Sequence, residues 1–193
     1  LNGMASNRAP VLAELPRAGV PPAFASYAEW EAWVERLAQL KVAEDYTRIW
    51  WDARPHPKLG TLEIRVPDQP TDVRLSAAFA ALLQALCAAA LDGALPGNSR
   101  FLADRGRADY VQNRWAAARF GPQADMLHPD GTSVRTAAVL GGELLELVRP
   151  HARRLGGEAL LARIDPTACE ADLQRQAESA ADATADLVAR SLG

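Results

Sequence analysis

The 193-residue sequence predicts an α+β fold with few strands and many helices. Two short stretches, 48–54 and 61–67, are rich in aromatic and β-branched residues and flank a loop that contains prolines and a glycine, which predicts a β-hairpin. Longer segments repeat apolar residues at helical spacing. Because 49% of the residues are hydrophobic, the chain can bury a substantial core, and we expect one domain over residues 1–193.

The predicted hairpin places charged side chains where a strand pair is usually apolar. Side chains alternate between two faces along a strand, so Asp52, Arg54, Glu63 and Arg65 share one face. A pairing centred on the loop sets Asp52 opposite Glu63, and facing carboxylates destabilise a strand pair unless a cation or an arginine lies between them. The hairpin therefore predicts a polar ligand site, with an ordinary half-exposed hairpin and weak surface ion pairs as the alternative. The apolar residues expected to form the floor are Ile49, Trp51, Ala53, Leu62, Ile64 and Val66.

Helices are predicted from capping residues and apolar spacing. Ser26 caps an amphipathic helix that carries Trp30 and Trp33. Thr71 or Asp72 caps a helix that is apolar on nearly all sides, so we expect it to be buried and to pack on the hairpin's floor. Further helices are expected at 105–120, 133–155, 157–164 and 166–193, with an extended connector at 10–25 and a polar loop at 120–131. The helix at 105–120 is expected to present Val111, Trp115 and Ala118 to a core.

Composition restricts the classes of partner. The net charge of -3 and the pI near 5.7 provide no basic surface for nucleic acid. The apolar run at 76–91 contains Gln84 and looks shorter than a bilayer span, so we expect no membrane partner. Cys87 is expected in the core and Cys169 is open between exposed and packed, which fits a reducing compartment. A soluble cytoplasmic protein is expected.

The segment DARPHPKLGTLEIRVPD at 52–68 resembles the signature of the type-2 glutamate-cysteine ligases, also called the carboxylate-amine ligase family. GMASNR at 3–8, LPRAGVPPAF at 15–24 and QNRWAAARFG at 112–121 resemble blocks of that family in the same order. The resemblance covers nearly the whole chain, though only about the C-terminal half of a family member. The family's opening strand, with closely spaced glutamates, has no counterpart here. We therefore expect the C-terminal portion of a catalytic domain, and a natural start at Met4 is the alternative.

The resemblance implies ATP-dependent ligation with ATP and Mg²⁺. The side-chain carboxylate of glutamate would be phosphorylated, and an amine such as cysteine would capture the acyl phosphate to give γ-glutamylcysteine, a step of glutathione biosynthesis. The implied fold is a glutamine synthetase-like antiparallel sheet, to which the hairpin contributes, covered by several α-helices. Implied partners are the N-terminal half and a second copy in a homodimer. The alternative is a catalytically inactive module that serves packing or dimerisation.

Site roles follow from the same resemblance. Glu63 and Arg65 match the family's GT-x-E-x-R strand and are the expected catalytic residues, Glu63 at the metal or nucleotide and Arg65 at the phosphate or acyl phosphate. Lysine would replace Arg65 poorly, because a guanidinium binds an oxyanion in a bidentate manner. Arg54 is expected to contact substrate or phosphate. Asp52 is either a second metal ligand or simply the ion-pair partner of Arg54.

The remaining substrate or phosphate candidates each have a plain alternative. Asn113 and Arg114 lie in the QNRW block, but adjacent helix residues diverge by roughly 100°, and a helix surface pair is the alternative. Arg8 is either a contact for the substrate carboxylate or a mobile terminal arginine. His56 is either a ligand contact at the edge of the sheet or a turn element.

Overall fold

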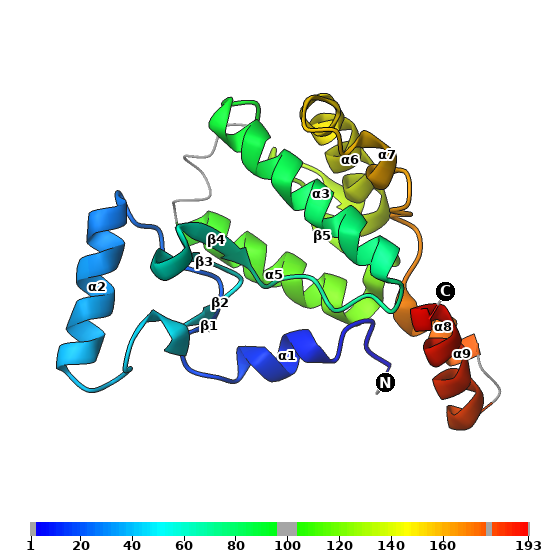
Figure 1. The fold of residues 1–193 in the computed structure, drawn as a ribbon, viewed down its shortest axis with the longest axis horizontal. Helices are drawn as coiled ribbons and strands as arrows, with labels where there is room; N and C mark the ends of the chain where they lie inside the picture. Colours follow the sequence, from blue (N-terminus) through cyan, green and yellow to red (C-terminus); the bar gives the residue numbers. More distant parts are fainter. Residues whose placement is uncertain (1–2, 96–103, 177–178, 193) are drawn as a thin grey trace.

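Helices make up most of the fold, and strands form short pairs (Figure 1). The computed structural model describes residues 3–95, 104–176 and 179–192. The helices are α1 (Arg8–Ala13), α2 (Tyr27–Gln39), α3 (Val73–Leu91), α5 (Asp104–Phe120), α6 (Ala137–Arg154), α7 (Glu158–Leu161), α8 (Glu170–Gln176) and α9 (Ala180–Leu192). The strands are β1 (Ala18–Gly19), β2 (Trp50–Trp51), β3 (Ala53–His56), β4 (Thr61–Ile64), β5 (Asp125–Leu127) and β6 (Val134–Thr136). The mixed α+β class is confirmed.

Two groups of elements flank a central helix (Figure 1). α3, α6 and α7 lie together on one side, whereas the hairpin β3–β4 and α2 lie on the other. α5 runs between them, and α1 lies along its lower side. Within the described ranges each sheet has two strands, so the glutamine synthetase-like sheet rests on the resemblance alone.

Three expected segments differ from the structure. The connector at 10–25 contains the end of α1 and strand β1, which pairs in parallel with β2. The loop at 120–131 contains β5, because the amide of Asn113 bonds Leu127 N at 2.7 Å and Leu127 O at 2.8 Å and holds that backbone extended beside α5. The helix expected at 166–193 is two helices, α8 and α9. The pairing of β1 with β2 and the bonds between Asn113 and Leu127 are tertiary contacts, and such contacts leave no local pattern in the sequence.

The hairpin forms, but its register differs from the expected one. Arg54 lies opposite Glu63, and Ala53 lies opposite Ile64. The prediction that Asp52 faces Glu63 is therefore wrong. Arg65 N donates to Asp52 O at 2.8 Å, which extends the same register beyond the strands. Gly60 closes the turn with φ 63°, a left-handed conformation that favours glycine.

The expected apolar floor is only partly buried. Ile49 and Trp51 are buried with Trp30 of α2 and Tyr46. Leu62 and Val66, however, are 52% and 46% exposed. Ser26 caps α2 as predicted, since its hydroxyl accepts from Glu29 N at 3.1 Å. The segment before the hairpin, from Tyr46 through β2, thus packs on α2, whereas Leu62 of β4 is left exposed.

Helix α3 packs on α6 and α7 rather than on the hairpin. Its cap is Asp72, one of the two predicted caps, which accepts from Arg74 N at 2.8 Å. Its fully buried residues form one stripe of alanines, so the prediction that the whole helix is buried is wrong. Cys87 is exposed, and its predicted place in the core is also wrong. Cys169 is half-buried. Leu82 and Leu86 are partly buried beside this stripe, whereas Val73 and Leu91 are exposed.

The length argument against a membrane span does not hold for α3. The helix has 19 residues and is apolar enough to cross a bilayer by length and composition. A single helix of this kind is weak evidence for a span, because core helices of soluble proteins meet the same criterion.

The buried face of α5 also differs from the prediction. Ala118 is buried as expected, together with Ala116. Val111 and Trp115 are instead 55% and 52% exposed. Two of the three residues of the predicted apolar stripe therefore face outward.

Candidate functional site

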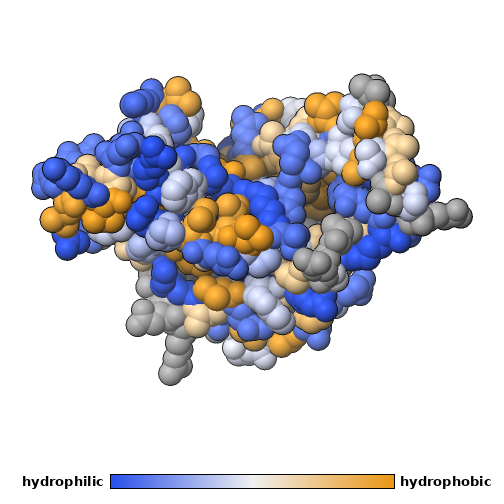
Figure 2. Space-filling view, turned by 90° about the horizontal axis from the view of Figure 1, so that it is seen from below, coloured by the Kyte–Doolittle hydropathy of each residue, from blue (hydrophilic) through white to orange (hydrophobic). Residues whose placement is uncertain are grey.

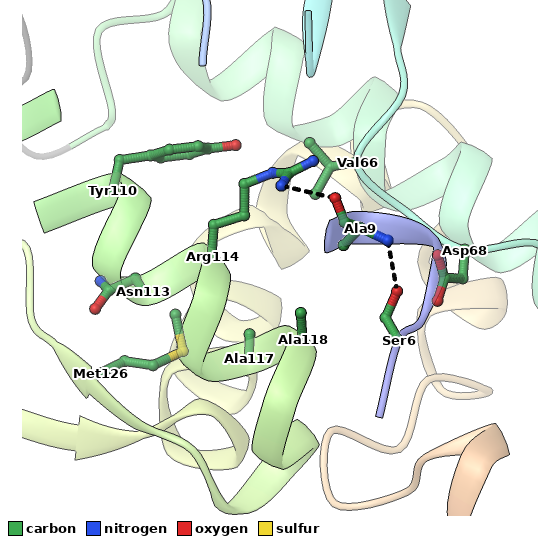
Figure 3. Close-up of a pocket in the computed structure, with 10 residues that line it drawn as sticks. All are labelled: Ser6, Ala9, Val66, Asp68, Tyr110, Asn113, Arg114, Ala117, Ala118 and Met126. Carbon is green, nitrogen blue, oxygen red and sulfur yellow. Dashed lines mark hydrogen bonds between the residues drawn. The ribbon is translucent and has the colours of Figure 1, made fainter. Parts of the chain in front are cut away.

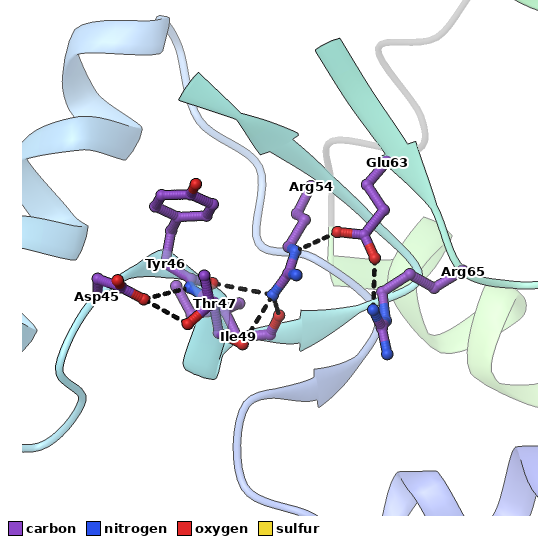
Figure 4. A network of polar contacts seen from close by, with 7 residues as sticks. All are labelled: Asp45, Tyr46, Thr47, Ile49, Arg54, Glu63 and Arg65. Carbon is purple, nitrogen blue, oxygen red and sulfur yellow. Dashed lines mark hydrogen bonds and ion pairs between the residues drawn. The ribbon is translucent and has the colours of Figure 1, made fainter. Parts of the chain in front are cut away.

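One face of the hairpin carries charged side chains that bond to one another (Figure 4). Arg54 Nε donates to Glu63 Oε2 at 2.7 Å. Arg65 Nη1 donates to the other oxygen, Glu63 Oε1. Both oxygens of Glu63 are thus engaged by guanidinium groups, so the predicted shared face of these three residues is confirmed.

Arg54 is enclosed by backbone carbonyls as well as by Glu63. It is 6% exposed, and its Nη1 donates to Tyr46 O at 2.9 Å, to Thr47 O at 3.1 Å and to Ile49 O. The residue therefore ties the turn before β2 to strand β4 (Figure 4). This position suits a structural arginine, and contact with substrate or phosphate stays a prediction.

The electrostatics of Glu63 favour its ionised form. Burial by itself would raise the pKa of Glu63. The hydrogen bonds and charges of Arg54 and Arg65 oppose this effect and hold the pKa of the carboxyl below its ordinary value. Glu63 is consequently a carboxylate at neutral pH.

Asp52 connects the hairpin to α5. It is 4% exposed, and its carboxylate accepts from Arg114 Nε at 2.8 Å and from Arg114 Nη2 at 3.0 Å. Tyr110 OH donates to Asp52 Oδ2 at 3.0 Å. Burial, and next the charge of Asp52, raise the pKa of the Tyr110 phenol. Asp52 pairs with Arg114 and not with Arg54, so the expected partner is corrected.

Arg114 retains part of its bonding capacity. A guanidinium has five N–H donors in a rigid plane. Arg114 uses two on Asp52 and a third, from Nη1, on Ala9 O at 3.2 Å (Figure 3). Two N–H groups then have no partner among the described residues. These donors could bind an oxyanion such as a carboxylate or a phosphate.

A cleft of about 370 Å³ lies beside Arg114 (Figure 3). Its walls come from the start of the chain, the segment after β4, α5 and β5. The polar side chains of the cleft are those of Ser6, Asp68, Tyr110, Asn113 and Arg114. Its remaining lining is apolar, and this combination is typical of a small-molecule site.

The structure brings some predicted residues to this cleft and keeps others apart. Asn113 and Arg114 both line it, although the side-chain amide of Asn113 is hydrogen-bonded to the backbone of Leu127 in β5. Arg8 lies near it, since its Nη2 donates to Arg65 O at 2.9 Å and its Nη1 lies 3.7 Å from Asp68. His56 lies elsewhere, at the end of β3, with its ring 5.1 Å from that of Tyr46.

The described residues do not by themselves fit a magnesium site. They contain no group of three or more His, Cys, Asp or Glu side chains that could hold a metal. Asp52 and Glu63, the predicted ligands, have both oxygens bonded to arginines. A cation at either carboxylate would have to displace a guanidinium.

Tyr110 is the residue that the sequence prediction missed. It lines the cleft and bonds the same carboxylate as Arg114. The available signal was its position four residues before Arg114, which places both side chains on one face of the helix.

Comparison with known proteins identifies the family. The family model described as glutamate-cysteine ligase family 2 matches residues 1–187. The chain belongs to glutamate-cysteine ligase family 2. A Rubrobacter xylanophilus protein named "Putative glutamate--cysteine ligase 2-3" is 42% identical over 175 residues, which cover 89% of this chain and 46% of that protein. "Glutamate--cysteine ligase" of Haloferax volcanii is 32% identical over 163 residues, which cover 84% of this chain and 43% of that protein.

These matches confirm the resemblance drawn from the hairpin signature. The chain spans about half the length of the relatives of glutamate-cysteine ligase family 2 that it matches. The chain thus corresponds to part of a family member.

Proposed function

We propose that this chain contributes the arginine-rich part of the active site of an ATP-dependent carboxylate-amine ligase. The reaction would join the side-chain carboxylate of glutamate to an amine such as cysteine through an acyl phosphate. Family membership and the names of the relatives support the ligase class. We further propose that the reaction uses ATP and Mg²⁺ and passes through the acyl phosphate.

The arrangement of Arg114 carries the proposal. Asp52 holds one edge of its guanidinium and Ala9 O takes a third donor, which leaves two donors beside the cleft. A guanidinium fixed in this way is preorganised for an anionic substrate, because little freedom is lost when the substrate binds. Glutamate, ATP and an acyl phosphate are all anions.

Arg65, like Arg114, is held by an ion pair with an acidic side chain. Glu63 engages its Nη1, while its Nε is buried and has no partner among the described residues. Unused donors at Arg65 and Arg114 can stabilise negative charge that develops during phosphoryl transfer. In this proposal Glu63 and Asp52 act through these arginines as positioning residues. Magnesium would take ligands from outside the described residues.

ADP release tests the ligase proposal. The intact mass of the natural gene product is measured first, to establish which polypeptide is assayed. That product is then incubated with ATP, magnesium, glutamate and a panel of amines. ADP release that requires both glutamate and one amine is the expected result, and the panel names the acceptor. ADP release without glutamate, or none with any amine, would contradict the proposal.

A non-catalytic module is the second candidate. Its support is that the ion pairs of Glu63 and Asp52 are satisfied internally, while the outer faces of α3 and α5 are open. This candidate predicts no effect of nucleotide on the protein. Thermal unfolding with and without ATP and magnesium separates the two, since a ligand that binds only the folded state raises the unfolding temperature.

A further inference from the structure

Asp68 is the carboxylate of the cleft beside Arg114. Among the described residues that line this cleft it is the only acidic one, and Figure 3 shows it on the side away from Tyr110. Its carboxylate has no hydrogen bond to any described residue. Asp52 and Glu63 differ, because arginines bond both oxygens of each. Asp68 therefore retains its full capacity to accept hydrogen bonds from a ligand.

Arg8 forms only a long ion pair with Asp68. Its Nη1 lies 3.7 Å from Asp68 Oδ1, which exceeds hydrogen-bond distance, and the two side chains are 37% and 46% exposed. The donors of Arg8 bond backbone carbonyls instead, with Nη2 2.9 Å from Arg65 O and Nη1 3.5 Å from Pro67 O. A long pair that is open to water contributes little, so a ligand cation can approach Asp68 without breaking a strong contact.

The backbone that carries Asp68 is held in place. Pro67 and Pro70 lie on either side of it, and the ring of each proline restricts its own backbone torsion. The bonds from Arg8 hold the carbonyls of Arg65 and Pro67. Cavities of about 370 and 410 Å³ both border Asp68, so its side chain has open space around it. A carboxylate on a fixed backbone beside open space is preorganised for a ligand.

The charges of the cleft indicate the kind of ligand that Asp68 takes. The charge of Arg114 is balanced by Asp52, whose oxygens lie 2.8 and 3.0 Å from its nitrogens, so Arg114 offers N–H donors with little net charge. The charge of Asp68 is compensated only by the long pair with Arg8. Asp68 therefore favours a cation. An ammonium group suits a single carboxylate, whereas a divalent metal takes several oxygen ligands, and the described lining of the cleft holds no second carboxylate.

The rest of the cleft limits the substituent of that ammonium group. The face of the molecule on which α1 lies shows hydrophobic patches between hydrophilic residues (Figure 2). The cleft borders α1 and has the same mixed character, because its apolar lining consists of Ala9, Val66, Ala117, Ala118 and Met126. Its volume of about 370 Å³ suits a small molecule. The expected ligand is a small primary ammonium with a short, largely apolar substituent.

We infer that Asp68 binds the ammonium group of the amine acceptor in this cleft and so selects acceptors that are cationic at neutral pH. The inference rests on the proposed function for the identity of the ligand. Asp68 acts in binding, before the chemical step. The ammonium then gives one proton to solvent, and the free amine forms the C–N bond. Phosphate leaves with the electron pair of the C–O bond and takes the second proton.

The test measures ADP release by the natural gene product with ATP, magnesium and glutamate. Cysteine, or the other amine that the panel names, is the cationic acceptor, and hydroxylamine, which is largely uncharged above neutral pH, is the uncharged one. Asp68→Asn should raise KM for the cationic acceptor about tenfold or more, because only a cation loses a charge-assisted bond. KM for hydroxylamine and for glutamate should stay within about twofold, and kcat should change less than KM.

Two further variants complete the test. Asp68→Glu keeps the charge and should recover part of the affinity for the cationic acceptor. Asp186→Asn is the matched control, because it removes the same charge from an exposed ion pair of α9 with Arg190, outside the lining of the cleft. It should leave every KM unchanged.

Three results would overturn the inference. They are an unchanged KM for the cationic acceptor in Asp68→Asn, an equal rise of KM for the cationic and the uncharged acceptor, or an equal rise in Asp68→Asn and Asp186→Asn. If circular dichroism shows Asp68→Asn to be unfolded, Asp68→Glu decides, since displacing the charge must still weaken the cationic acceptor more than hydroxylamine. A parent product that releases no ADP with any amine fails the ligase proposal itself, whereas an active parent with unselective variants fails the role of Asp68 alone.

Discussion

Asp52 and Arg114 form the ion pair that joins the hairpin to α5. Arg114 Nε and Nη2 lie 2.8 and 3.0 Å from the two carboxylate oxygens. The side chain of Asp52 is 6% exposed and that of Arg114 is 16% exposed, so both charges are largely removed from water. The pair spans 62 residues of sequence and therefore fixes the tertiary arrangement of the two elements.

Asp52→Asn should destabilise the chain strongly. The substitution keeps the shape of the side chain but leaves the charge of Arg114 without its partner, and breaking a buried pair in this way costs about 3 kcal/mol. Urea unfolding measures the loss. Glu44→Gln is the control, because its pair with Arg48 is exposed to water and should contribute little to stability. Equal losses in the two variants would show that the Asp52 pair is not a structural tie.

Tyr110→Phe should identify a phenol that resists ionisation. Burial and the neighbouring Asp52 carboxylate both disfavour the phenolate, so the pKa of Tyr110 is raised. The ultraviolet difference between the parent chain and the variant should therefore show no step near the ordinary value of about pH 10. A difference step at that pH, in protein that circular dichroism shows to be folded, would contradict the bond to Asp52.

Sequence alternation predicted the faces of the hairpin but could not predict its register. A shift of one residue moves every side chain to the other face, whereas a shift of two residues leaves the faces unchanged. The expected pairing of Asp52 with Glu63 and the observed pairing of Arg54 with Glu63 differ by such a shift. Both satisfy the apolar pattern. The difference matters chemically, because it replaces facing carboxylates with an ion pair.

The sequence also could not predict which apolar side chains are exposed. The spacing of Val111 and Trp115 and the apolar character around Cys87 predict burial, yet all three are exposed. An apolar pattern indicates that a side chain will be covered and does not say by which element. Helix ends depend on local bonds. The cap Ser26 was accordingly predicted correctly, and Asp72 was one of the two caps predicted for α3.

Arg54→Lys should act mainly by lowering the free energy of unfolding. Loss of a ligand contact is not expected to be its main effect. The single ammonium of lysine cannot reach Glu63 and the carbonyls of Tyr46 and Ile49 together, so buried acceptors lose their donor. We expect a loss of about 2 kcal/mol in the free energy of unfolding. Chemical denaturation provides the measurement. A variant as stable as the parent would return Arg54 to the substrate-binding role predicted from the sequence.

Arg65→Lys should have the opposite profile. Its side chain is 26% exposed and, among the described residues, forms one ion pair, with Glu63, so the fold should remain intact. Loss of its unused guanidinium donors should lower ADP release by about a hundredfold, as removal of one preorganised donor does in other enzymes. Turnover is measured in the glutamate and amine assay. Unchanged turnover would remove Arg65 from the mechanism.

Glu63→Gln should change the pH dependence of stability. Arg54 and Arg65 lower the pKa of Glu63 in the folded state, so the unfolded chain takes up a proton first as the pH falls. The ionised carboxylate therefore stabilises the fold above its ordinary pKa of about 4.3, and this contribution is lost as the pH falls through the folded-state value. The variant lacks the ionisable group. Its unfolding temperature should lie below that of the parent at neutral pH, and the gap should close in acid; a gap that stays constant with pH would show that the two arginines do not stabilise the charge of Glu63.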